Sequence, residues 1–171
     1  MYNNGGIPEK NSLKEEIRSL LEWCEKKESE GELGRTFFDA PIEEDKMTKW
    51  EEKNGVKIPE SYKEWLRFSE KCWIDGTTAA FWGPDEFHSE YVQEDLVVIG
   101  AVIGDGEVVC FSKETGEFVR LFESRRTGYK SFDEIVSFIC KTIDASPILS
   151  EEEYHELLEK IKAKKEAEKK S

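Results

Sequence analysis

The sequence contains no stretch of about 18 consecutive apolar residues, the length that a transmembrane helix needs, so we predict no membrane span. Its first residues, MYNNGGIPEKNS, have neither a basic start nor an apolar core and do not fit a secretory signal peptide. Cysteine occurs only four times, at Cys24, Cys72, Cys110 and Cys140, and never as a CxxC pair. We expect these residues to be free, mostly buried thiols of a cytoplasmic protein.

Histidine is scarcer still, since His88 and His155 are the only two and neither has a Cys or His nearby in the sequence. A zinc site needs clustered ligands, so we expect no metal site and no other cofactor. Cations are outnumbered, with 25 Lys and Arg against 38 Asp and Glu and a formal net charge of −13. Because phosphate contacts need Lys and Arg, nucleic-acid binding is disfavoured, whereas a basic protein partner is favoured.

Apolar patterning predicts one α+β domain. Hydrophobic residues make up 37% of the 171 residues, enough for a core. Helical spacing of apolar residues predicts helices at 12–29, 42–53, 59–71, from 131 onward and at 150–169. Capping-box pairs at Ser12–Glu15, Ser131–Glu134 and Ser150–Glu153 support three of these starts.

Between the helices the pattern changes to that of strands. We predict strands at 77–82, 96–103, 107–112 and 117–122, and the last three form an antiparallel meander because short turns join them. The resulting fold is an antiparallel or mixed sheet with helices packed on one face. The side chains expected to be buried are Tyr62, Trp65, Leu66, Ile99, Phe111, Phe132, Ile135 and Ile139.

Four segments in order carry a family resemblance. They are WEEKNGVKIPESYKEWL at 50–66, FWGPDEF at 81–87, GEVVCF at 106–111 and SFDEIVSFI at 131–139. Together they resemble the SUKH superfamily, which includes fungal cell-wall synthesis regulators of the Smi/Knr type and many bacterial toxin-immunity proteins. The resemblance implies a SUKH-like α+β domain that binds other proteins and has no shared catalytic residue.

The resemblance also suggests how the chain is organised. Residues 1–41 would be a tail and accessory helix, 42–145 the SUKH-like core and 146–171 a C-terminal accessory helix, within one globular domain overall. The chain departs from the family in having Glu107 where Asp is frequent and a single Gly in the segment 72–76.

One stretch has no cation at all: from Cys72 to Ser112 there is neither Lys nor Arg. Its eight acids are Asp75, Asp85, Glu86, Glu90, Glu94, Asp95, Asp105 and Glu107. Several fall in predicted turns, so we expect them to form one connected negative surface that complements a basic partner and speeds association. A solvated face without a partner is the alternative. Weak calcium binding is another, although the acids lack EF-hand spacing.

Aromatic residues could anchor such an interface. Trp73, Phe87 and Tyr91 are the candidates because aromatic side chains dominate binding hot spots, and a place in the core is the alternative for each. Phe81 and Trp82 lack the nearby cations that a base-stacking site would need, and are expected in the core.

The sequence gives little indication of a catalytic site. The pair Asp85–Glu86 fits a solvated turn, and His88 fits a structural histidine better than a general base. The sequence contains no GxSxG motif, and the glycines at 100–106 do not spell GxGxxG. Our first hypothesis is therefore a non-catalytic immunity protein that neutralises a basic toxin domain, such as a nuclease. An intracellular scaffold of the cell-wall-regulator type is the alternative, and an uncharacterised hydrolase is the third.

Overall fold

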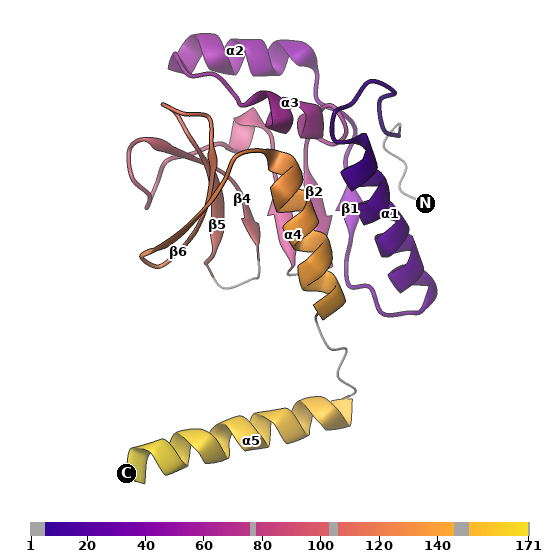
Figure 1. Ribbon diagram of the computed structural model, residues 1–171, viewed down its shortest axis with the longest axis vertical. Helices are drawn as coiled ribbons and strands as arrows, with labels where there is room; N and C mark the ends of the chain where they lie inside the picture. Colours follow the sequence, from indigo (N-terminus) through magenta and orange to yellow (C-terminus); the bar gives the residue numbers. More distant parts are fainter. Residues whose placement is uncertain (1–5, 76–77, 103–105, 146–150, 171) are drawn as a thin grey trace.

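The computed structural model describes residues 6–75, 78–102, 106–145 and 151–170. Among these residues it contains five α-helices and one seven-stranded sheet (Figure 1). The helices are α1 (Lys14–Ser29), α2 (Glu44–Asn54), α3 (Glu60–Leu66), α4 (Phe132–Ala145) and α5 (Glu151–Lys170). The strands are β1 (Phe37–Phe38), β2 (Cys72–Ile74), β3 (Ala79–Phe81), β4 (Leu96–Val102), β5 (Val108–Ser112), β6 (Phe118–Phe122) and β7 (Arg125–Tyr129). A short 3-10 helix, η1 (Pro84–Glu86), follows β3.

The sheet confirms the predicted α+β class. Its strands pair in the order β1-β2-β3-β4-β5-β6-β7, and every neighbouring pair is antiparallel. The predicted meander is therefore β4, β5 and β6. The strand predicted at 77–82 is the shorter β3. Three strands, β1, β2 and β7, were not predicted, because the first two are very short and the third, RRTGY, has no apolar alternation.

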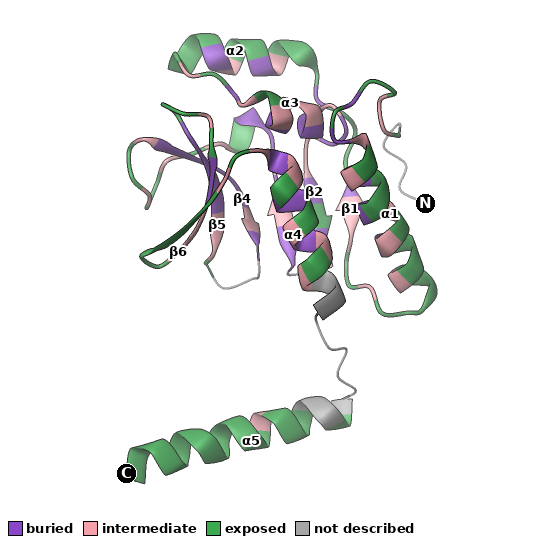
Figure 2. Cartoon of the chain, viewed as in Figure 1, coloured by how far each residue is buried: buried purple, intermediate pink, exposed green. Residues whose placement is uncertain are grey.

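The main core lies between the helices and one face of the sheet, and a smaller buried cluster of Leu96, Val98, Cys110 and Val119 lies on the other face. All eight side chains that the sequence placed inside are at most 2% exposed. Phe132 lies at the centre of an aromatic group, with ring centroids 4.8 Å from Tyr62, 5.1 Å from Phe81 and 5.4 Å from Trp65. Figure 2 shows the buried positions on the inward sides of the helices and on the strands behind them.

Helix α1 belongs to this core. Leu13, Ile17, Leu20 and Cys24 are fully buried within it, and α1 packs beside α4. The capping box predicted at its start is wrong: the helix begins one residue after Leu13 without a side-chain cap, and the Ser12 amide donates to Glu64 Oε2 instead. Of the other two pairs, Glu134 accepts from the Ser131 amide, and Ser150 lies outside the described residues.

Helix α3 ends five residues earlier than predicted. The chain after Leu66 hydrogen-bonds across to residues 39–42 instead of continuing the helix, since Glu70 N donates to Ala40 O and Asp39 N donates to Lys71 O. This exchange leads the chain directly into β2. Helix α2 stops where expected, because Gly55 has φ 63°, a left-handed conformation that favours glycine.

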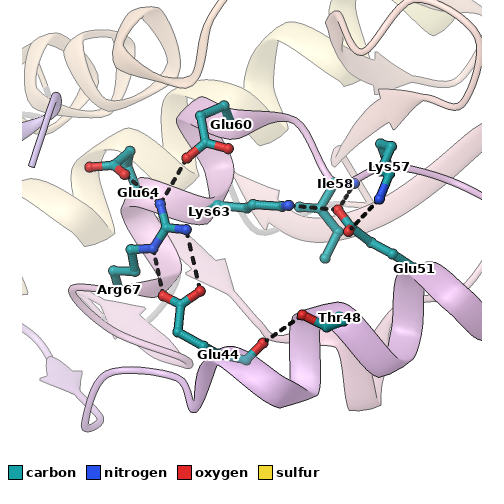
Figure 3. Close-up of polar contacts among 9 residues, drawn as sticks. All are labelled: Glu44, Thr48, Glu51, Lys57, Ile58, Glu60, Lys63, Glu64 and Arg67. Carbon is teal, nitrogen blue, oxygen red and sulfur yellow. Dashed lines mark hydrogen bonds and ion pairs between the residues drawn. The ribbon is translucent and has the colours of Figure 1, made fainter.

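Charged side chains fasten α2 to α3 (Figure 3). Glu51, only 7% exposed, accepts from the Ile58 amide at 3.0 Å and pairs with Lys63 Nζ at 2.8 Å and Lys57 Nζ at 3.2 Å. Nearby, the Arg67 guanidinium pairs with three carboxylates, those of Glu44, Glu60 and Glu64. These contacts fix the α2–α3 hairpin, and a separate ion pair, between Lys46 Nζ and Asp85 at 3.7 Å, joins α2 to η1.

Candidate partner-binding surface

Antiparallel strands place consecutive connections at opposite ends of a sheet, and this separates the predicted acids. Asp75 follows β2 and Glu107 precedes β5, so both lie at one end. Asp85, Glu86, Glu90, Glu94 and Asp95 belong to the connection between β3 and β4, at the other end. The seven residues of β4 put about 20 Å between the two groups. The acids thus lie in two groups, and Asp105 lies outside the described residues.

Three of the acids meet cations from outside the 72–112 stretch. Lys46 Nζ lies 3.7 Å from Asp85, Lys71 Nζ lies 2.7 Å from Glu86, and Arg120 Nε lies 2.8 Å from Glu107. Sequence reasoning missed these cations, since all three lie outside the acidic stretch, 13 to 39 positions from the acids they meet, and only the fold brings each pair together. Asp85 and Glu86 therefore remain at the surface, but nearby cations partly neutralise their negative charge. The Glu107 side chain is only 13% exposed.

Asp75 is engaged in hydrogen bonds within the fold. Its carboxylate accepts from the Gly34 amide at 2.7 Å and from the Thr78 hydroxyl at 3.2 Å, and its own amide donates to the Thr36 hydroxyl at 2.8 Å. The residue also has φ 51°, a left-handed conformation that is uncommon for a non-glycine residue. Asp75 therefore ties the segment before β1 to the end of β2.

The other end of the sheet carries a projecting segment, residues 88–95, which we call the 88–95 loop. Glu90 and Glu94 are exposed on it, and Tyr91 is 100% exposed with φ 64°. The base of the loop is held firmly: Ser89 Oγ donates to Leu96 O at 2.6 Å, and Lys113 Nζ donates to Glu94 O at 2.6 Å. The loop thus presents an aromatic side chain between acids on a fixed base.

The three aromatic candidates have different surroundings. Phe87 packs in the core, with its ring centroid 5.2 Å from Trp50 and 6.1 Å from Phe111. Trp73 is 41% exposed on the sheet face away from the helices. Tyr91 and Trp73 are therefore accessible to a partner, whereas Phe87 anchors the start of the 88–95 loop in the core.

A hollow of about 430 Å³ lies between α2 and η1, next to the acids of this end. Its lining mixes Lys46, Lys49 and Lys53 with Asp85. Because charges of both signs meet here, the negative character of this end belongs to the 88–95 loop and does not extend onto α2.

The chemistry of the candidate catalytic groups also follows from their surroundings. Burial raises the pKa of both Cys72 and Cys110 to about 12, so these thiols stay protonated at neutral pH and are poor nucleophiles. His88 is exposed and lines a hollow of about 180 Å³ whose described lining includes no carboxylate. Within the described residues, no group of three His, Cys, Asp or Glu is arranged to hold a metal ion, and no helix is long and apolar enough to cross a membrane.

Comparison with known proteins agrees with this fold. The model of the SMI1 / KNR4 family (SUKH-1) matches residues 41–140, from the start of the α2 segment to the middle of α4. No curated protein matches the chain. The matched region is more than half of the chain and contains the α2–α3 hairpin, six strands of the sheet and the 88–95 loop, while α1, β1 and α5 lie outside it. The chain belongs to the SMI1/KNR4 family (SUKH-1).

Proposed function

We propose that this protein is a non-catalytic immunity protein that neutralises a basic toxin domain, and that the 88–95 loop is its principal contact. Proteins of this family are typically immunity proteins, which supports the class of partner. One observation carries the choice of surface: Tyr91 is fully exposed in a left-handed backbone conformation between the exposed acids Glu90 and Glu94.

A non-glycine residue in a left-handed conformation costs about 1–3 kcal/mol, and such strained residues cluster at binding sites. In a complex, the Tyr91 side chain becomes a hot spot, because tyrosine buries a large area and can still hydrogen-bond through its hydroxyl. Acids beside it would meet the cations of a toxin's substrate groove, which speeds encounter and sets the orientation of binding. The loop therefore combines an anchor with electrostatic steering.

The test is binding kinetics with the toxin domain encoded beside the gene of this protein. Tyr91→Ala is expected to speed dissociation by about tenfold or more, as for loss of a hot-spot residue. Glu90→Lys with Glu94→Lys is expected to slow association by about tenfold at low salt, and the difference should shrink as salt screens it.

The matched control reverses two exposed acids of α1, Glu22→Lys with Glu25→Lys, which changes the net charge equally. It should affect association much less, because α1 lies outside the proposed contact. Equal effects of the two charge reversals, together with an unchanged dissociation rate in Tyr91→Ala, would refute the loop as the contact. Absence of binding to the toxin domain would favour the scaffold function.

A further inference from the structure

Helix α2 carries a stripe of lysines beside the hollow between it and η1. Lys46, Lys49 and Lys53 lie three and four residues apart, so they share one face of the helix with Trp50. All four residues line the hollow of about 430 Å³. We call the three lysines the α2 lysine stripe. Three cations on one helical face form a local positive patch in a chain of net charge −13.

A second hollow, of about 180 Å³, adjoins the first. Trp50, Asn54 and Phe87 line both hollows, and the rings of Trp50 and Phe87 pack edge to face with centroids 5.2 Å apart. Val56 and Val97 add apolar walls to the smaller hollow. We call the two hollows together the α2 groove. It combines a preformed aromatic floor with a few polar and cationic groups, an arrangement typical of binding sites.

The cations of the α2 groove are only partly neutralised within the chain. Lys46 Nζ pairs with Glu70 at 2.9 Å, and Lys49 Nζ pairs with Asp45 at 2.7 Å. The second pair is exposed, so water weakens it. Lys53, which is also exposed, forms no ion pair with any described residue. The α2 lysine stripe therefore keeps positive charge for a ligand of opposite sign.

The other rim of the α2 groove is the base of the 88–95 loop. His88 and Ser89 line the smaller hollow together with Lys113. Lys113 Nζ donates to a backbone carbonyl, Glu94 O, and pairs with no carboxylate in the part of the chain that the structure describes. A partner that covers the tip of the loop therefore reaches the α2 groove as well. The surface offered to it has two adjoining parts of opposite sign, acidic on the loop and basic in the groove.

We infer that the α2 groove binds an acidic segment of the same partner, with carboxylates opposite the α2 lysine stripe and an apolar side chain on Trp50 and Phe87. The inference rests on the proposed function and adds the chemistry of the partner, a basic surface bordered by acids. A nuclease that uses Mg²⁺ has such a surface, because cations hold the phosphates of its substrate while carboxylates hold the metal. Two contacts of opposite sign also fix the orientation of the partner, since the reversed orientation would bring like charges together.

Charge reversal on α2 tests this inference through the sign of its effect. Lys49→Glu with Lys53→Glu adds negative charge beside the acidic loop, so a partner whose contact surface is basic throughout would bind this variant more tightly. A partner that places an acidic segment in the α2 groove should bind it about tenfold more weakly, with faster dissociation. The measurement is binding kinetics with the toxin domain encoded beside the gene of this protein.

The matched control is Lys160→Glu with Lys164→Glu, two exposed lysines of α5 that have the same spacing and give the same change of net charge. It should not weaken binding. All four lysines are exposed, so both double variants should unfold at nearly the same urea concentration as the parent. An unchanged or higher affinity of the Lys49→Glu, Lys53→Glu variant would overturn the inference.

A further variant, Asn54→Tyr, tests the apolar part of the contact. Asn54 is exposed and lines both hollows, so a ring at this position should fill the mouth of the α2 groove. Exclusion of the partner's apolar side chain should weaken binding by about tenfold. An unchanged affinity would show that no side chain of the partner enters the groove, and would overturn the inference.

Carbodiimide cross-linking of the parent complex separates the two contacts, since the reagent joins an amine directly to a carboxylate beside it. Lys49 or Lys53 should become linked to acids of the toxin domain, whereas Glu90 and Glu94 should become linked to its lysines. Links through Glu90 or Glu94 alone would overturn this inference and leave the loop contact standing. Links through the two lysines alone would support the groove and refute the loop as the principal contact. A toxin domain that does not bind at all would overturn both.

Discussion

Replacing Glu51 by alanine should destabilise the protein strongly, although the residue is a charged one near the end of a helix. The substitution removes the acceptor of the Ile58 amide and the partner of Lys63, whose side chain is only 19% exposed. An orphaned buried amide together with a broken, largely covered ion pair costs about 3 kcal/mol of unfolding free energy. For a chain of this length that corresponds to a fall in Tm of about 6–12 °C.

The assay is urea unfolding followed by circular dichroism, with Tm from a thermal scan. Glu51→Gln keeps an acceptor for Ile58 but loses the charge, so it should lose about half as much stability as the alanine variant. The neighbour Glu52, which is exposed, supplies the control: Glu52→Ala should stay within about 0.5 kcal/mol of the parent. The error of such a comparison is about 1 kcal/mol. If the free energies of unfolding of Glu51→Ala and Glu52→Ala differ by no more than this, this account of the hairpin is refuted.

The same carboxylate gives the stability a pH dependence. Burial alone would raise the pKa of Glu51, but the bonds donated by Lys63, Ile58 and Lys57 hold the pKa below its ordinary value. A folded-state pKa below the unfolded one adds stability that is fully present above about pH 4.3 and is lost as the pH falls through the lower value. The parent should therefore lose more stability between neutral and acid pH than Glu51→Gln, and equal losses would contradict this.

Three further outcomes are expected. Gly100→Ala should destabilise by several kcal/mol, roughly 2–4, because a Cβ there would lie 2.3 Å from Phe81 Cδ1 and 2.5 Å from a backbone oxygen, and Tm measures it. Tyr62→Phe should lose about 1–2 kcal/mol through the hydrogen bond to Trp82 O at 2.7 Å, measured by urea unfolding. A thiol reagent should modify Cys140 first, and the other three cysteines, which are buried, only on unfolding; fast reaction of all four would contradict their burial.

Some of the fold could be predicted because the signals are local. The run LVVIGAVI at 96–103, with short turns after it and after β5, leaves little choice but adjacent antiparallel strands. Pro59 and Gly55 mark the ends of two helices through backbone geometry alone. Strand β7 has no such signal, since its residues are mostly exposed and its strand conformation comes from pairing with β6.

The candidate site was less predictable, because charge along a sequence is not charge in space. The sequence by itself determined the acidic run, the meander and the aromatic core, all of which depend on residue type and short-range spacing. Only the tertiary structure decided which acids lie together and which have a cation nearby. The antiparallel topology places Asp75 and the 88–95 loop at opposite ends of the sheet. Packing brings Lys46 close to Asp85 and Arg120 close to Glu107. Electrostatic interaction depends on distance through space, and that distance is set by the fold.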